Sequence, residues 1–136
     1  MPNPNNYPGA PSIGAPWVMA LKGDAPVATA IPLFSNAQIT QNTTDTTRSI
    51  LTALDWMSVN VNITAVTGTS PTATFRIQWS YDNTYWAEAQ PQDILGTATA
   101  PINVIERFQI KAPYWRLAVV VTGTNPVFTC TANALV

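Results

Sequence analysis

Apolar and polar residues alternate strictly between positions 57 and 66. The apolar positions are Met57, Val59, Val61, Ile63 and Ala65, and serine, asparagine or threonine separates them. A period of two over this length is typical of a strand with one buried and one solvated face. Residues 67–71 (TGTSP) indicate a turn, after which Phe75, Ile77 and Trp79 resume the alternation. The pattern predicts an antiparallel hairpin whose tip is residues 67–71.

The same arrangement recurs near the end of the chain. Residues 114–121 (YWRLAVVV) lead into 122–126 (TGTNP) and then into 127–134 (VFTCTANA). The hexapeptides at 66–71 and 121–126 differ only at Ser70 and Asn125. Because glycine allows positive φ and proline presets a turn φ, each copy predicts a hairpin tip. Two interpretations stay open: the tips are purely structural, or they are paired binding loops at one end of a sandwich.

Other segments complete an all-β pattern. Residues 17–21 and 27–34 are β-rich, and Pro32 restricts the second run to an edge strand. We expect a loop with room for one short strand over residues 35–47, a loop over 90–101 and a strand over 102–110. The apolar spacing of residues 48–54 permits one or two helical turns, but the threonine-rich flanks favour a strand. The count of about eight strands predicts an antiparallel β-sandwich or jelly roll.

The first sixteen residues contain five prolines and two glycines and indicate an extended arm before a single domain over residues 17–136. The arm has two open interpretations. It is a disordered tail, or it lies along a neighbouring subunit, with Tyr7, Ile13 and Trp17 as candidate assembly contacts.

Composition argues against an enzyme. The chain has no histidine, which removes Ser–His and Cys–His nucleophile pairs and histidine-ligated metal sites. The seven carboxylates include no pair marked for glycoside hydrolysis, and no phosphate-binding loop is present. The single cysteine, Cys130, lies in an alternating run and is expected to be a small buried hydrophobe. We therefore predict a non-enzymatic protein without cofactor or metal.

The low charge of the chain limits the classes of partner that it can bind. Only 10% of the residues are charged, against about 25% in ordinary globular proteins, and the net charge is −1. The six basic residues are scattered, which argues against nucleic acid, and no apolar run is long enough for a bilayer. No basic and apolar leader precedes the domain, so we expect synthesis in the cytoplasm without a signal peptide. A surface of threonine and amides repels like copies weakly and favours packing between subunits.

One turn concentrates the aromatic residues. Asp82-Asn83 tolerates left-handed geometry, and Trp79 and Trp86 flank the turn. Exposed aromatic faces stack on sugars, so Tyr81, Tyr85 and Trp86 are candidates for a glycan-binding platform. The alternative is that the two tryptophans are core residues and the tyrosines cover their rim.

The run from Leu54 to Val136 resembles small structural proteins of tailed bacteriophages. The resemblance lies in VTGTSP, in the segment FRIQWSYDNTYW over residues 75–86, and in YWRL before the second TGTNP. The SYDNTYW hairpin is also similar to discoidin-type, galactose-binding-like jelly rolls, although those carry Asp-Gly where this chain has Asp82-Asn83.

The phage resemblance implies a virion protein, and we expect a capsid decoration (cement) protein on the outer surface of the head. Such a protein would contact the major capsid protein and its own copies, often as a homotrimer, and use a terminal arm to clasp neighbours. The alternative is a carbohydrate- or receptor-binding β-sandwich module of a phage tail or head fibre.

Overall fold

The structure is a computed structural model that describes residues 30–49 and 56–135. It contains seven strands and one short 3₁₀ helix within these ranges. The elements are β1 (Ile31–Ile39), β2 (Thr43–Thr44), β3 (Arg48–Ser49), β4 (Trp56–Ser80), η2 (Pro91–Asp93), β5 (Ile94–Ala98), β6 (Ile102–Gln109) and β7 (Tyr114–Leu135). The prediction of an all-β antiparallel fold is confirmed. None of the described helical residues forms a helix long and apolar enough to cross a membrane.

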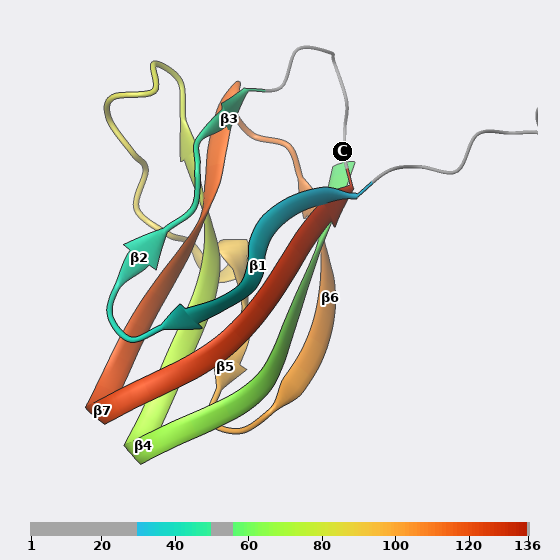
Figure 1. The fold of residues 1–136 in the computed structure, drawn as a ribbon. Helices are drawn as coiled ribbons and strands as arrows, with labels where there is room; N and C mark the ends of the chain where they lie inside the picture. Colours follow the sequence, from blue (N-terminus) through green and yellow to red (C-terminus); the bar gives the residue numbers. More distant parts are fainter. Residues whose placement is uncertain (1–29, 50–55, 136) are drawn as a thin grey trace, which may run out of the picture.

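All seven strands belong to one antiparallel sheet. Its order is β1-β7-β4-β5, while β2 and β3 also pair with β7, and β6 also pairs with β4. The two central strands are unusually long, with 25 residues in β4 and 22 in β7. Both bend sharply at the same end of the molecule, so the sheet folds back on itself (Figure 1).

The bend divides the sheet into two halves. Half-sheet A contains β1, residues 127–135 of β7, residues 56–66 of β4, and β6. Half-sheet B contains β2 and β3, residues 114–121 of β7, residues 72–80 of β4, and β5. Each half is therefore four strands wide, and both central strands contribute to both halves.

The two TGT segments form the corner between the half-sheets, which we define as residues 67–71 and 122–126. The hairpin predictions for these segments are wrong, because the two arms that flank each segment do not pair with each other. Instead β4 and β7 pair with each other through the corner, where Thr69 lies opposite Thr124 and Thr72 opposite Thr122. Register shifts on either side of Thr69 bend the strands, as bulges do where strands pass from one layer to another.

The corner also explains why the motif occurs twice. A Cβ atom on Gly68 would lie 2.7 Å from the carbonyl oxygen of Asn125, and one on Gly123 would lie 2.8 Å from that of Ser70. Both glycines have φ near +118°, and both partner residues have φ near +48°. Each copy thus packs its glycine against the backbone of the other, in equivalent conformations. Of the two interpretations of the repeat, the contacts favour a structural role.

The core lies between the half-sheets. Alternate residues of β4 and β7 are buried on both sides of the corner, in one cluster that includes Val59, Ile77, Leu117 and Phe128. The predicted alternation is confirmed for β4 except at Ala65, which is exposed because the register shifts between Ile63 and Ala65. Cys130 is fully buried as predicted, and its burial raises the pKa of the thiol to about 12.

Two further boundaries differ from the predictions. β1 continues through Ser35 and Asn36 into the predicted loop, with register shifts and a positive φ at Asn36. β5 lies inside the predicted 90–101 loop and pairs with β4. The glycine and the two threonines of this segment are why its sequence does not read as a strand. The edge position expected from Pro32 is confirmed, since β1 is the outermost strand beside β7. The 1–16 arm, the candidate contacts Tyr7, Ile13 and Trp17, and residues 50–54 lie outside the described residues.

Candidate functional site: an aromatic cleft beyond strand β4

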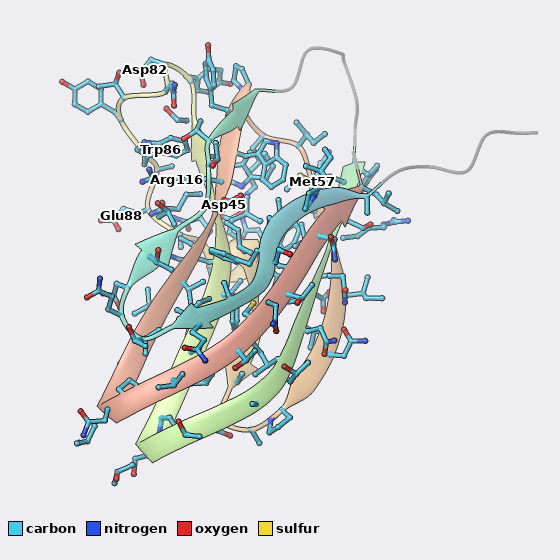
Figure 2. All side chains as sticks on the ribbon, viewed as in Figure 1. Asp45, Met57, Asp82, Trp86, Glu88 and Arg116 are labelled. Carbon is cyan, nitrogen blue, oxygen red and sulfur yellow. The ribbon has the colours of Figure 1, made fainter. Side chains whose placement is uncertain are left out.

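A cleft follows the end of β4 that points away from the corner. It has a volume of about 480 Å³. Its wall is the segment between β4 and β5, and Lys111 and Ala112 from the β6–β7 connection complete it. We call residues 81–90 the aromatic loop and this space the aromatic cleft. Figure 2 shows Asp82, Trp86 and Glu88 on this side of the molecule, with Arg116 beside Trp86.

A hydrogen-bonded turn shapes the start of the aromatic loop. Asp82 Oδ1 accepts hydrogen bonds from the backbone N–H groups of Thr84 and Tyr85, both at 2.9 Å. Ser80 Oγ accepts one from the N–H of Asn83, also at 2.9 Å, and donates to Asp82 Oδ1. Asn83 has φ +61°, so the left-handed geometry expected at Asp82-Asn83 is confirmed. The Tyr85 and Thr84 bonds lower the pKa of the Asp82 carboxyl below its usual value.

A buried carboxylate forms the floor of the cleft. Asp93 Oδ1 accepts hydrogen bonds from Lys111 Nζ at 2.6 Å and Trp79 Nε1 at 3.1 Å, and Oδ2 accepts one from the N–H of Gln90 at 3.0 Å. Burial raises the pKa of Asp93, but these three donors lower it by more, and it lies below its usual value. Sequence reasoning missed this cluster, because nothing in the spacing of these four residues indicates that they meet.

The two tryptophans of the turn have different environments. Trp79 is buried and lies directly opposite Trp115 in the β4–β7 ladder, so it is a core residue. Trp86 is half-buried, and the guanidinium carbon of Arg116 lies 4.0 Å from the centroid of its ring. Arg116 Nε also donates to Gln78 Oε1 at 2.8 Å, which holds the guanidinium in place. The core interpretation is therefore correct for Trp79, whereas Trp86 sits at the cleft wall.

The two tyrosines are strongly exposed. Tyr81 is 79% and Tyr85 80% accessible, and both line the cleft. The structure thus brings together all three residues predicted as a glycan platform, Tyr81, Tyr85 and Trp86. Glu88, an exposed carboxylate at the same cleft, was not among the predicted residues.

The cleft offers aromatic faces and carboxylate oxygens. The pKa values of its carboxyls Asp82 and Asp93 are lowered, whereas a general acid for glycoside hydrolysis needs a raised one. Within residues 30–49 and 56–135, no three His, Cys, Asp or Glu side chains are grouped so that they could hold a metal ion. The arrangement can stack a ligand and accept hydrogen bonds from it.

A second surface stands out on the opposite half of the sheet. The solvated side of β4, β6 and β7 in half-sheet A presents Ser58, Asn60, Asn62, Asn103, Thr129, Thr131 and Asn133. Three large apolar side chains are exposed at its end nearer β3: Trp56 at 49%, Ile105 at 69% and Leu135 at 42%. Arg107 is its one charge, and its guanidinium carbon lies 4.7 Å from the Trp56 ring centroid. We call this surface the amide face. Sequence analysis predicted a strand over residues 102–110 without assigning its faces, and the pairing of Ile105 with Asn60 is what places Ile105 on the solvated side.

Comparison of the chain with protein-family models, with curated proteins and with solved structures gives no match.

Proposed function

We propose that the chain is a non-enzymatic structural protein of a tailed-phage virion, of the capsid decoration type. It binds the outer surface of the head through the major capsid protein and through its own copies. The amide face is the observation that supports this proposal. It carries one charge on three neighbouring strands, and that charge is stacked on a tryptophan.

This composition matches the centre of a protein interface better than an ordinary solvated face. Interface centres are depleted in charged side chains and enriched in aromatic residues and arginine. Trp56 and Arg107 are of the residue types that most often dominate binding energy, and Ile105 and Leu135 add exposed apolar area beside them. Asn60 Nδ2 donates to Asn103 Oδ1 at 2.6 Å, so the amides of the face are ordered by hydrogen bonds between strands.

The chemistry of the carboxylates supports a binding role over catalysis. Asp93 accepts hydrogen bonds from three donors, and Asp82 accepts the hydrogen bonds that close a turn. Both carboxylates therefore stabilise the fold. Bridging several capsid subunits converts modest contacts at each one into stable attachment, through effective concentration. A folded sheet whose exposed face carries a single charge suits that task. In this proposal the arm over residues 1–16 clasps a neighbouring subunit, with Tyr7, Ile13 and Trp17 as its contacts.

The experiment compares three proteins: the full chain, an Ile105→Asp variant and a chain lacking residues 1–16. Light scattering gives the mass of each in solution, and co-sedimentation measures binding to heads of the phage that encodes the chain. We expect an oligomer, with a trimer as the specific expectation, that binds heads and loses binding in the Ile105→Asp variant. Glu88→Gln, at an exposed residue of the aromatic loop, is the matched control and should bind as the unchanged chain does. A monomer in all cases with no binding to heads would contradict the proposal.

A further inference from the structure

We propose that the aromatic cleft is a binding site for an uncharged sugar residue of a glycan, stacked on Tyr81, Tyr85 and the open side of Trp86. This site is separate from the amide face and does not depend on the virion role. The volume of about 480 Å³ falls within the range of small-molecule clefts, about 300 to 1,000 Å³.

The stacking surfaces are accessible to a ligand. Tyr81 and Tyr85 are four-fifths exposed, although aromatic side chains gain most by burial. One side of the Trp86 ring is covered by Arg116, which does not line the cleft, while Trp86 itself does. With the guanidinium on one side of the ring, the opposite side is the one that a ligand in the cleft could stack on. The C–H face of a pyranose is a flat apolar surface of the kind that packs on such rings.

Hydrogen-bond acceptors lie beside these rings. The hydrogen bonds from described residues to the Asp82 carboxylate all end at Oδ1, so Oδ2 keeps its acceptor capacity, and Asp82 is an exposed residue that lines the cleft. The carboxylate of Glu88 lines the same cleft. Ionised carboxylates only accept hydrogen bonds, and sugar hydroxyls are donors that match them. Aromatic faces flanked by acceptors fit a ligand with apolar faces and hydroxyl edges.

The charges of the cleft select against acidic sugars. Three carboxylates line it, Asp82, Glu88 and Asp93, and its one cation, Lys111, is bound to Asp93 at 2.6 Å. An anionic ligand would meet a surplus of negative charge without a free cation. An uncharged hexose or N-acetylhexosamine avoids that repulsion.

The loop is also ordered before any ligand arrives. The Asp82 turn and the Ala87 N–H to Trp79 carbonyl bond of 2.9 Å hold both ends of the aromatic segment. A platform that is already ordered loses little conformational entropy on binding.

The test is titration of the full chain with neutral oligosaccharides that end in galactose, glucose, mannose or N-acetylglucosamine, followed by isothermal calorimetry. Sialyllactose and tetramethylammonium serve as the anionic and cationic probes. We expect at least one neutral sugar to bind at millimolar concentration or below, and Tyr85→Ala and Tyr81→Ala each to weaken it by up to about tenfold, the factor that one aromatic contact provides.

Trp56→Ala is the matched control, because Trp56 is an exposed aromatic residue of the amide face and lies outside the cleft. It should leave sugar binding unchanged. The proposal is overturned if no neutral sugar binds, if sialyllactose or tetramethylammonium binds more tightly than every neutral sugar, or if Trp56→Ala weakens binding as much as Tyr85→Ala. The tyrosine variants should keep the solution mass of the unchanged chain, so a failure of this site is distinguishable from a failure of the virion proposal.

Discussion

The corner and the aromatic loop have similar sequence signals and different effects on the chain. Both combine residues that tolerate positive φ with turn-forming neighbours, Gly68 and Ser70 in one and Asp82 and Asn83 in the other. The aromatic loop turns the chain back, so that the N–H of Ala87 bonds to the carbonyl of Trp79. The corner folds β4 back as well, but its two arms pair with β7 and not with each other.

The difference lies in what satisfies the backbone at each place. In the aromatic loop, the side chains of Ser80 and Asp82 accept hydrogen bonds from backbone N–H groups two or three residues further along the chain, so the turn is local. At the corner the partner is another copy of the same motif in a distant part of the chain, and strand pairing persists. Positive φ therefore marks a change of backbone direction, while the available partners decide whether a local turn forms or two distant strands fold back together.

The largest effect is expected at the corner. Gly68→Ala places a Cβ 2.7 Å from the carbonyl oxygen of Asn125 at a φ of +117°, and the opposing atoms are backbone that cannot easily move. We expect a loss of about 3 kcal/mol in the free energy of unfolding, measured with denaturant. The thiol of Cys130 should also react faster with a disulfide reagent, because opening the sheet exposes it.

Gly96→Ala is the matched control for this variant. Gly96 also has positive φ, at +157°, but a Cβ there meets nothing within 4 Å. Its cost should be near 1 kcal/mol, so the difference reports the contact across the corner. Equal costs for the two variants would contradict reciprocal packing as the reason for the repeated glycine.

A smaller loss is expected at the floor of the aromatic cleft. Asp93→Asn removes the charge paired with Lys111 and should lower the free energy of unfolding by about 2 kcal/mol at neutral pH. Because the pKa of Asp93 is lowered in the folded state, its contribution is present above the unfolded pKa and is lost as pH falls through the folded one. The gap between the two proteins should therefore close as pH falls below about 4.

Denaturant unfolding across the acid range measures this gap. Glu88→Gln is the control, since its exposed carboxylate lines the same cleft but is not paired with Lys111. A gap that stays constant down to acid pH would show that the ionised form of Asp93 is not what stabilises the floor.

A still smaller effect is expected at the cleft wall. Arg116→Ala removes the guanidinium stacked on Trp86 and should cost about 1 kcal/mol, with a red shift of tryptophan emission as the ring gains solvent contact. Arg116→Lys keeps the charge but not the planar stack, so its free energy of unfolding should lie between that of the unchanged chain and that of Arg116→Ala. If Arg116→Lys matches the unchanged chain, the planar contact contributes nothing.

The smallest effect is expected from exchanging the one residue that differs between the two TGT segments of the corner. Ser70 and Asn125 have nearly the same φ, +48° and +49°, and asparagine tolerates this region better than serine. Ser70→Asn should stabilise the fold by about 0.5 kcal/mol, and Asn125→Ser should destabilise it by a similar amount. Thermal unfolding of both variants provides the measurement, and shifts of the same sign would contradict the equivalence of the two copies.

The sequence by itself determined the local properties of this chain. Alternation specified which residues of β4 face the core, except Ala65, and Pro32 specified an edge strand. The Asp82-Asn83 turn, the burial of Cys130 and the grouping of Tyr81, Tyr85 and Trp86 also followed from neighbouring residues. Each depends on interactions that act over a few positions.

Only the tertiary structure decided how distant segments meet. A glycine at positive φ is compatible with a hairpin or a bend, and the choice depended on pairing between residues 67–71 and 122–126. The same is true of two side-chain contacts between distant segments: Asp93 with Trp79 and Lys111, and Arg116 with Trp86. No repeat or spacing in the sequence links the residues of either contact. Strand pairing is set by the summed burial and hydrogen bonding of whole strands, which no local pattern contains.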